Sequence, residues 1–359
     1  MKYFTNYRKG GESLKALSYV GPGKKEFVDK PKPVVQLPTD AVIRITKTTI
    51  CGTDLHILRG NVPAVESGRI LGHEGIGIVE EVGEGVNNFK KGDKVIISCV
   101  TACGKCENCK VGLHAHCDDG GWILGHLIDG TQAEYVRIPH ADNSLYHVPK
   151  EADEEAMVML SDILPTGFEI GVLYGKVQPG QTVAIIGAGP VGLAALLTAQ
   201  FYSPGRIIVV DLDDNRLEAS LKFGATDVIN SSDGKTIEKI MELTDGEGVD
   251  VAMEVVGIPA TFEVCQKIIK PGGSIPVLGV HGKPVDFHLE ELWIKNITLT
   301  TGLVNTNTTS MLLKTVESNT LKPEQLVTHR FKFEEMLKAY DVFEKSAENK
   351  ALKIILSNE

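Results

Sequence analysis

The sequence has no long apolar run and no block of basic residues. No apolar stretch reaches the roughly 20 residues that a membrane-spanning helix needs. Lys and Arg together number 37 against 47 Asp and Glu, so the formal net charge is -10, and the basic residues form no cluster. We therefore expect a protein that neither crosses a membrane nor binds nucleic acid, and whose acidic balance mainly favours solubility.

A secretory signal, internal repeats and low-complexity segments are also missing. The opening stretch, MKYFTNYRKGGESLKAL, carries basic side chains but lacks the apolar segment of a secretory signal. A cytoplasmic location is the simplest expectation, with a weak organellar address left open. Only seven cysteines occur, and four of them lie within residues 103–117. In a reducing compartment this pattern favours a metal site over disulfide bonds.

The length and the hydrophobic pattern predict two domains. The 359 residues exceed the usual length of one hydrophobic core. Short β-rich runs punctuated by Gly, Pro and Asp predict a compact β-rich domain first. Six apolar runs of strand length, alternating with helical patterns, then predict a doubly wound parallel sheet of the α/β class. Because the last helices and strand follow the sixth run, we expect them to return to the first domain. The predicted domains are 1–164, completed by 305–359, and 165–304.

A glycine-rich turn follows the first of the six apolar runs. Gly187, Gly189 and Gly192 form a G-x-G-x-x-G pattern in VAIIGAGPVGLAALLTAQ, with Pro190 and Val191 at the predicted helix start. Such glycines permit a tight turn, a close approach of the backbone to a pyrophosphate, and close packing of helix on strand. Amides at the helix N-terminus then meet the phosphate charge. The pattern predicts a dinucleotide site; the alternative is a Gly-rich turn in an α/β domain without a ligand.

An acidic residue at the end of the next run completes this pattern. Asp211 closes RIIVVD, where a carboxylate accepts hydrogen bonds from the ribose hydroxyls of adenosine. Its charge also repels a 2′-phosphate. The sequence therefore predicts NAD rather than NADP as the cofactor.

The four clustered cysteines have the spacing C-x2-C-x2-C-x7-C. Four thiolates can close a tetrahedral shell around zinc without leaving room for water, so a structural zinc is expected on Cys103, Cys106, Cys109 and Cys117. Unmetallated buried cysteines are the alternative. His114 and His116 lie in the same segment and are expected to be surface loop residues.

A catalytic zinc needs an open position and hence three protein ligands. Candidates lie in TICGTDLHILRG, ILGHEGIGIVEEVG and MLSDILPTGFE. Cys51 ends a β-rich run and His73 follows a glycine in a turn, so loops can bring the two together. Taken alone, each residue is as readily structural, because many histidines and cysteines are simply satisfied in a core.

The motifs resemble those of the zinc-dependent alcohol dehydrogenases of the medium-chain dehydrogenase/reductase superfamily. They occur in the order CGTDLH, GHEGIG, GDKV, the four-cysteine lobe, SDILPTG and G-x-G-x-x-G. The resemblance runs from about Leu14 to the C-terminus. It implies a GroES-like β-rich catalytic domain and a Rossmann domain, with the lobe binding structural zinc.

The resemblance also implies a set of catalytic-zinc ligands. Cys51 and His73 match the first two, and Asp162 matches the Asp form of the third, found in bacterial secondary alcohol dehydrogenases. Glu74 is similar to a residue that approaches or exchanges onto the metal, and Asp54 to the carboxylate that orients the liganding imidazole. Secondary alcohol dehydrogenases with this Asp often lack the four cysteines, so the sequence combines features of two branches.

The same resemblance implies a proton relay and cofactor contacts. A proton passes from the alcohol to Thr53, to a ribose hydroxyl of the nicotinamide nucleotide, and to His56. Turn-forming and surface roles are the alternatives for these two residues. Further cofactor contacts are expected at Thr166, Val256, Leu278 and Val280.

These observations predict an NAD- and zinc-dependent alcohol dehydrogenase acting on small primary or secondary alcohols. A polyol or threonine dehydrogenase of the same superfamily is the first alternative, and a non-catalytic dinucleotide-binding or zinc-stabilised protein the second. The second is disfavoured because Cys51, His73 and Thr53 are all present beside the glycines. Relatives are dimers or tetramers, and we expect a homo-oligomer, with a tetramer favoured.

Overall fold

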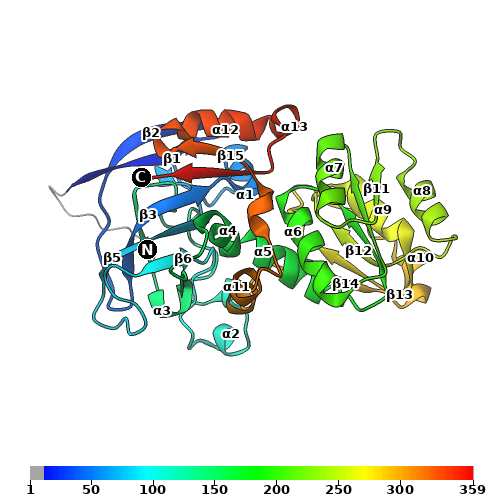
Figure 1. Cartoon of the computed structure of the whole chain (residues 1–359), viewed down its shortest axis with the longest axis horizontal. Helices are drawn as coiled ribbons and strands as arrows, with labels where there is room; N and C mark the ends of the chain where they lie inside the picture. The colour runs from blue at the N-terminus through cyan, green and yellow to red at the C-terminus, as the bar shows by residue number, and fades with distance from the viewer. Residues whose placement is uncertain (1–11, 359) are drawn as a thin grey trace. The chain divides into compact units, whose positions relative to one another are not determined.

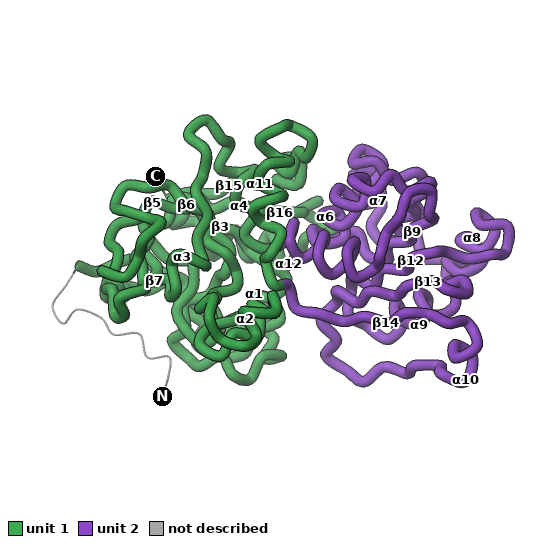
Figure 2. The backbone as a smooth tube through the Cα atoms, turned by 90° about the horizontal axis from the view of Figure 1, so that it is seen from below, with its two compact units in different colours: residues 1–162, 305–359 green, residues 163–304 purple. Residues whose placement is uncertain are grey.

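The computed structural model describes residues 12–358, and the chain divides into two compact units (Figure 2). Unit 1 comprises Met1–Asp162 and Asn305–Glu359, and unit 2 comprises Ile163–Val304. The first boundary lies after residue 162, slightly before the predicted residue 164, because the Asp162 side chain contacts residues of unit 1. The stretch used to predict the absence of a secretory signal begins with residues 1–11, which lie outside the described part.

Unit 1 contains two β-sheets. A three-stranded sheet has the order β2-β1-β4, and a seven-stranded sheet has the order β15-β16-β3-β5-β6-β8, with β7 paired to β3. The smaller sheet consists of β1 (Ser13–Gly21), β2 (Lys24–Pro31) and β4 (Arg69–Ile70). The larger sheet consists of β3 (Ala41–Thr49), β5 (Gly75–Val82), β6 (Lys94–Ile97), β7 (Tyr135–Ile138), β8 (Leu145–His147), β15 (Val327–Lys332) and β16 (Lys353–Ser357).

Short helices connect these strands. They are α1 (Gly52–Leu58), α2 (Glu107–Lys110), α3 (Ala141–Ser144), α4 (Glu154–Val158), α11 (Thr309–Glu317), α12 (Met336–Glu344) and α13 (Ser346–Asn349). Single 3₁₀ turns occur at η1 (His114–His116), η2 (Met159–Ser161), η6 (Pro323–Leu326) and η7 (Phe333–Glu335).

The C-terminal segment is part of the hydrophobic core of unit 1. One core packs α12 and β16 against β1 and α1, and it includes Leu17, Ile50, Ile57, Tyr340 and Ile354. Figure 1 shows α12 and β16 in red next to the blue strands β1 and β2. A second core fills the larger sheet between β3, β5, β6 and β7. The last 55 residues of unit 1 are therefore held by burial of apolar surface, because the N-terminal strands supply the partner faces.

Unit 2 is a doubly wound parallel sheet, which confirms the predicted fold class. Its six strands have the order β11-β10-β9-β12-β13-β14, and every pair is parallel. They are β9 (Thr182–Ile186), β10 (Arg206–Asp211), β11 (Asp227–Asn230), β12 (Val249–Glu254), β13 (Ile269–Val277) and β14 (Thr298–Thr301). The order changes direction between β9 and β12, and this is the place where such sheets bind ligands.

Helices cover both faces of this sheet (Figure 1). Helices α6 (Pro190–Ala199) and α7 (Asp214–Lys222) lie on one face, and α8 (Thr236–Leu243) and α9 (Pro259–Ile268) on the other. The remaining helical segments are α5 (Ile163–Thr166), the π-helical turn η3 (Gly167–Leu173), the 3₁₀ turn η4 (Gln200–Tyr202), α10 (Leu289–Leu292) and the 3₁₀ turn η5 (Trp293–Lys295). Burial on both faces explains why the central strands read as continuous apolar runs.

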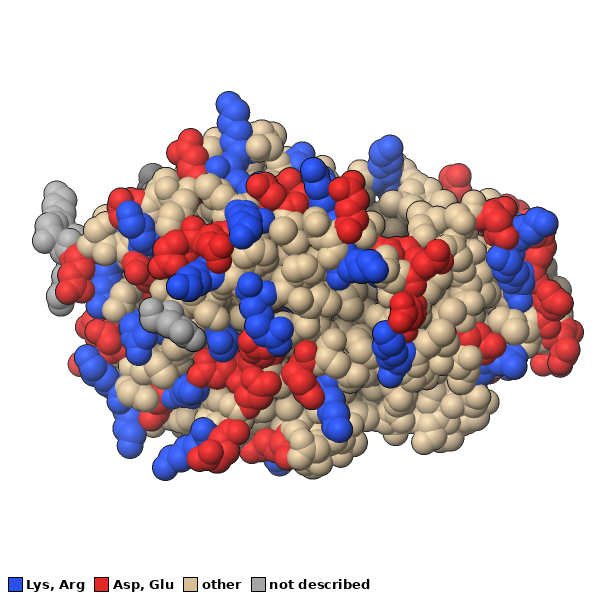
Figure 3. All heavy atoms as spheres, turned by 45° about the horizontal axis from the view of Figure 1, so that its top comes forward, with Lys and Arg blue, Asp and Glu red and all other residues tan. Residues whose placement is uncertain are grey.

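The surface carries charges of both signs. On the face drawn in Figure 3, Lys and Arg are interspersed with Asp and Glu. Within residues 12–358, no single helix is long and apolar enough to cross a membrane, and one bent pair, Glu154–Ser161 with Ile163–Leu173, passes that test by length and composition.

Candidate active site

Three of the predicted site residues lie on helix α1. Cys51 is the N-cap of this helix and has an extended backbone, with φ -106° and ψ 156°. Asp54 accepts a hydrogen bond from the Cys51 backbone N–H at 2.9 Å, which satisfies one free donor of the helix N-terminus. The hydroxyl of Thr53 lies 3.7 Å from Cys51 Sγ, and His56 is half-buried two residues beyond Asp54. The short helix therefore places a thiol, a hydroxyl and an imidazole in one neighbourhood.

His73 and Glu74 enter the site from the connection between β4 and β5. Gly72 has φ +91°, and a Cβ there would lie 2.9 Å from the Gln132 backbone nitrogen. Only glycine fits this turn, because both the positive φ and the close backbone disfavour a side chain. The turn directs His73 and Glu74 inward, where they are 4% and 1% exposed.

Asp162 completes the cluster as its fourth side chain. It follows the turn η2, and its Oδ2 lies 3.2 Å from His73 Nε2 and 3.8 Å from Cys51 Sγ. One ligand atom from each of Cys51, His73, Glu74 and Asp162 lies within 4.8 Å of all the others. Zinc bonds of about 2.0–2.3 Å in a tetrahedron separate the ligand atoms by roughly 3.3–3.8 Å, so these residues fit a zinc ion.

The cluster has the charge that a cation site requires. Burial by itself lowers the pKa of His73, but hydrogen bonds to Asp162 and Cys51 raise that pKa well above its usual range. The neighbours that raise this pKa favour a positive charge at the site, which a bound zinc ion would supply. Within residues 12–358, Glu74 Oε1 is buried and has no hydrogen-bond partner, as expected of an oxygen next to a cation.

Lys353, which the sequence reasoning missed, holds the other oxygen of Glu74. The Lys353 ammonium and the Thr49 hydroxyl both bond Glu74 Oε2, and Lys353 is 1% exposed. Burial disfavours its charge, yet Glu74, Cys51 and Asp162 raise the pKa of Lys353, so it stays an ammonium. A lysine inside the apolar run ALKIIL was a visible signal, because charged residues are rarely buried without a partner.

Cys99 is a second residue that the sequence reasoning missed. Its Sγ lies 3.7 Å from Asp162 Oδ1, on the side of the carboxylate away from His73. Burial and the charge of Asp162 raise the pKa of Cys99 well above its usual range, so the thiol keeps its proton and donates to Asp162. It lies two residues after the end of β6, and nothing in its local sequence distinguished it from an ordinary core cysteine.

The four remaining predicted thiols meet in a separate lobe of unit 1. Cys103, Cys106, Cys109 and Cys117 form a second group whose ligand atoms lie within 4.8 Å of one another. Cys106 is the N-cap of α2 and accepts from the Cys109 backbone N–H at 3.4 Å. Backbone N–H groups of Asp118 and Cys109 lower the pKa of Cys106 to about 7, whereas burial raises that of Cys109 to about 12. Four thiols fit a closed structural zinc site, because they fill a tetrahedral shell by themselves.

The dinucleotide motif occupies the predicted place in unit 2. Gly187 follows β9, Gly189 is the N-cap of α6, and Pro190 and Val191 form its first turn. A Cβ on Gly192 would overlap the Gly187 carbonyl oxygen, so glycine is required for the helix to pack against the strand. The free amides at the start of α6 suit an anion such as a pyrophosphate.

Asp211 lies at the carboxyl end of β10, next to this turn. Its Oδ2 accepts from the Ala188 backbone N–H at 2.7 Å, and its Oδ1 accepts from Leu212 and Asp213 at 2.8 and 3.0 Å. Arg216 Nη1 is 3.8 Å from Asp211 Oδ2. The carboxylate is thus held in place by backbone donors before any ligand arrives.

The four other predicted cofactor residues also belong to unit 2. Val256 follows β12, and Leu278 and Val280 follow β13. The Val256 side chain lies close to Gly187, since a Cβ added to that glycine would be 2.7 Å from a methyl carbon of Val256. Val256 and Val280 are exposed, and Thr166 ends α5. The buried carboxylate of Glu254, which the sequence reasoning missed, joins the two strand ends. It accepts from the backbone N–H groups of Val256 and Gly257 at 3.0 and 2.9 Å, and one of its oxygens lies 3.1 Å from His281 Nε2.

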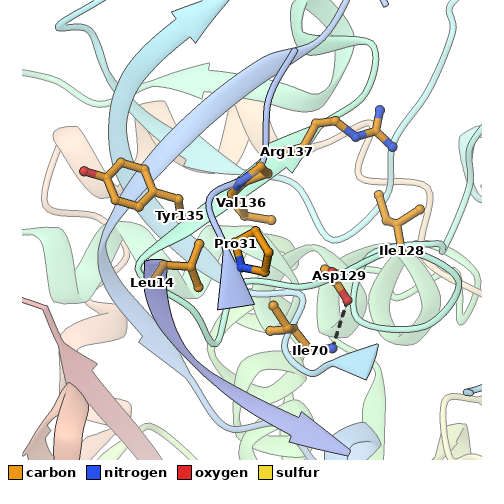
Figure 4. Close-up of a pocket in the computed structure, with 9 residues that line it drawn as sticks. Leu14, Pro31, Ile70, Ile128, Asp129, Tyr135, Val136 and Arg137 are labelled. Carbon is orange, nitrogen blue, oxygen red and sulfur yellow. Dashed lines mark hydrogen bonds between the residues drawn. The ribbon is translucent and has the colours of Figure 1, made fainter. Parts of the chain in front are cut away.

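A small cavity elsewhere in unit 1 is unrelated to these sites (Figure 4). It measures about 10 Å³, and its lining includes Leu14, Pro31, Ile70, Asp129 and Tyr135. Asp129 accepts from the Ile70 backbone N–H at 3.0 Å, as the dashed line shows. Such a space holds about one water molecule, so it is too small for an alcohol substrate.

Comparison with known proteins places the chain in a family. The alcohol dehydrogenase GroES-like domain matches residues 37–150, and the zinc-binding dehydrogenase domain matches residues 190–318. An alcohol dehydrogenase of Cupriavidus necator is 36% identical over 355 residues, which cover 92% of this chain and 95% of the relative. The chain belongs to the zinc-dependent alcohol dehydrogenase family. The resemblance predicted from the motifs is thereby confirmed.

Two further proteins that are similar to this chain bear on the chemistry of the family. The structure of zinc dependent alcohol dehydrogenase 2 from Streptococcus pneumonia has a TM-score of 0.93 and 65% identity, and covers 97% of this chain and 99% of that one. The NADP-dependent isopropanol dehydrogenase of Thermoanaerobacter brockii is 34% identical over 336 residues, 91% of this chain and 95% of the relative. Family membership thus implies zinc and a nicotinamide dinucleotide, and leaves open which dinucleotide is used.

Proposed function

We propose that this chain is a zinc-dependent alcohol dehydrogenase that reversibly oxidises small primary or secondary alcohols to aldehydes or ketones with NAD. The observation that carries the proposal is the buried convergence of Cys51, His73, Glu74 and Asp162, with ligand atoms within 4.8 Å. Three of these side chains complete a catalytic zinc site with one open position, and Glu74 is a fourth, exchangeable ligand. A second zinc on the four-cysteine lobe has a structural role.

The zinc ion and the nicotinamide nucleotide would supply the reactivity, and the side chains of the protein would hold and orient them. When bound, zinc lowers the pKa of an alcohol hydroxyl and the nicotinamide takes up a hydride. Cys51 and Asp162 contribute two negative charges, which neutralise the ion, while His73 contributes a neutral nitrogen. Lys353 holds Glu74 through their ion pair, and the Asp54 carboxylate faces His73 Nδ1 at 3.8 Å, so the ligands need little reorganisation when a substrate binds.

Thr53 and His56 are proposed to move the alcohol proton. The Thr53 hydroxyl lies beside the ligand Cys51, 3.7 Å from its Sγ, where it would accept the alcohol proton while it donates its own proton to the next group of the relay. His56 lies on the same helix and is half-buried, so it connects the interior with solvent. Burial and the neighbouring Arg59 lower the pKa of His56, which keeps the ring neutral and able to accept a proton at neutral pH.

The carboxylate of Asp211 supports NAD as the preferred cofactor. Its side chain is 11% exposed and three backbone N–H groups fix it at the end of β10. A 2′-phosphate at this position would meet a fixed negative charge, whereas a ribose hydroxyl donates to it. Comparison of kcat/KM for the two cofactors tests this choice. A tenfold or greater preference for NADP would show that Asp211 does not exclude the phosphate.

The decisive experiment is the initial rate of NADH formation by zinc-loaded protein with 2-propanol. A robust NAD-dependent rate supports the reaction class and the secondary-alcohol branch to which Asp162 points. Ethanol, a polyol and threonine are the parallel substrates, because a polyol or threonine dehydrogenase shares the same chemistry. Failure with all four would reject the proposed function, and activity restricted to the last two would redirect it.

Unit 2 also supports the proposed homo-oligomer. Strand β14 is the edge of the six-stranded sheet, and nearby Trp293 and Ile294 are 67% and 68% exposed. An edge strand next to exposed apolar side chains favours association with another copy. We propose a tetramer, or else a dimer, and a monomer by light scattering would contradict both.

A further inference from the structure

A buried chain of three polar side chains lies behind the candidate metal site. Asp54 Oδ2 accepts from Gln132 Nε2 at 3.0 Å, and Gln132 Oε1 accepts from the Tyr340 hydroxyl at 2.8 Å. Asp54 is 1% exposed, and Gln132 and Tyr340 are fully buried. Because water does not reach these groups, each depends on the others for its hydrogen bonds.

The amide of Gln132 has only one favourable orientation in this chain. Its Nε2 donates both to Asp54 and to the Thr49 backbone carbonyl, at 3.0 and 3.1 Å. Turning the amide over would place its oxygen against two acceptors, a carboxylate and a carbonyl. The Tyr340 hydroxyl donates to the remaining end, so it holds the amide in the orientation that Asp54 requires.

Asp54 passes this constraint to the imidazole of His73. Its Oδ2 receives two donors, the amide of Gln132 and the Cys51 backbone N–H at 2.9 Å. Its Oδ1 has no hydrogen-bond partner within residues 12–358 and faces His73 Nδ1 at 3.8 Å. The other ring nitrogen, Nε2, faces Asp162. The carboxylate thus stands ready to fix the ring whose far side holds the metal.

We propose that Gln132 and Tyr340 are positioning residues for the catalytic metal and act through Asp54 on His73. This inference rests on the proposed function. Tyr340 belongs to α12, 208 residues beyond Gln132, so this helix contributes to the metal site through Gln132 and Asp54, whereas Lys353 of the same C-terminal segment bonds Glu74 directly. The hydrogen bonds of Gln132 and Tyr340 described above go to Thr49, Asp54 and each other, all outside the four-cysteine lobe, so a zinc ion in that lobe should not respond.

The test is zinc release from the intact protein to a chromogenic chelator, measured for wild type, Tyr340→Phe and Tyr146→Phe. The first variant removes a single buried hydroxyl. Tyr146→Phe is the matched control. It also removes a tyrosine hydroxyl of unit 1, but this hydroxyl donates to the Thr306 carbonyl at 3.1 Å and does not belong to the hydrogen-bonded series Asp54–Gln132–Tyr340. The release phase that disappears in Cys51→Ser identifies the catalytic zinc.

Loss of an outer partner typically lowers metal affinity or activity by about 10–100-fold, and the more remote Tyr340 should lie near the lower limit. We expect Tyr340→Phe to speed the Cys51-dependent phase about tenfold and to lower kcat by a few-fold, with KM for NAD unchanged. An unchanged phase, or equal acceleration in both tyrosine variants, would overturn the inference. Gln132→Leu, which removes both ends of the amide, should have the larger effect, and an unchanged release rate there would overturn it as well.

Failure of the proposed function gives a different result. In that case wild type forms no NADH with any of the alcohols, whatever the zinc release shows. If wild type is active and Tyr340→Phe releases zinc as slowly as wild type, only the inference about positioning fails.

Discussion

Unit 1 contains two clusters of side chains that fit a metal ion, and both include cysteine, but they are assembled from different parts of the sequence. The four thiols of the lobe come from residues 103–117, whereas the Cys51 cluster takes its ligand atoms from positions 51, 73, 74 and 162. In the lobe, local backbone N–H groups lower the pKa of Cys106 to about 7. In the other cluster, Lys353 comes from β16 to pair with Glu74, while Asp54 on α1 faces His73, which lies in the connection between β4 and β5. The comparison indicates that the lobe is held by groups close to it in sequence, whereas the Cys51 cluster also depends on a lysine 279 residues away from Glu74.

The largest expected effect is at Cys51. Replacing Cys51 by Ser should remove the zinc that the proposed chemistry needs and lower kcat/KM by at least about 10³-fold, because Lewis-acid stabilisation is worth several kcal/mol. Metal analysis should show one zinc per chain in place of two. Cys265→Ala, which removes a buried thiol of unit 2, serves as the control and should keep both. If the Cys51→Ser variant kept two zinc ions and a normal rate, the Cys51 cluster would not be the catalytic metal site.

The second prediction concerns the buried ion pair that supports only the Cys51 cluster. Lys353→Met leaves the charge of Glu74 buried without its partner, so the free energy of unfolding should fall by about 3–5 kcal/mol. Lys338→Met removes an exposed pair with Glu335 and should cost at most about 1 kcal/mol. Denaturant unfolding measures both values. Equal effects would mean that Lys353 is no more important than a surface lysine.

The third prediction addresses the lobe. Cys106→Ser should lose the structural zinc and destabilise the protein by roughly 3 kcal/mol, a fall in Tm of about 6–12 °C. The rate measured well below the new Tm should remain within about threefold of wild type, because the other cluster is intact. Calorimetry tests the expected loss of stability, and an activity assay at low temperature tests the expected retention of the rate. Loss of activity without loss of stability would assign the lobe a chemical role.

The smallest effect is expected for the proton pathway. His56→Ala should slow NADH formation about tenfold near pH 6.5 and less at pH 9, since hydroxide can replace the missing base at high pH. The direction follows from the lowered pKa of His56, which keeps the wild-type ring neutral and able to accept a proton over this range. His147→Ala, whose ring contacts the Asn88 carbonyl, is the control. Parallel pH profiles for His56→Ala and wild type would exclude His56 from the relay.

Much of the fold could be predicted because its signals are local. Apolar runs such as TVAII and RIIVVD predicted the strands β9 and β10, and the glycines of the motif predicted the turn between strand and helix. The four cysteines of the lobe were equally accessible, because their spacing alone brings the thiols together. For Cys51, His73 and Asp162, family resemblance was needed, since each is an ordinary residue type at an unremarkable position.

The sequence by itself determined the two-domain architecture, the glycine turn, the acid at Asp211 and the cysteine lobe. The residues of the glycine turn and of the cysteine lobe lie close together along the chain, and the change of hydrophobic pattern after the first domain is also a local signal. Only the tertiary structure decided which side chains support the ligands. Glu74 meets Lys353 across 279 residues, and Gln132 meets Tyr340 across 208. Such pairs depend on how the C-terminal segment packs into the core of unit 1. Burial of apolar surface drives this packing. The local sequence does not specify which polar groups the packing brings together.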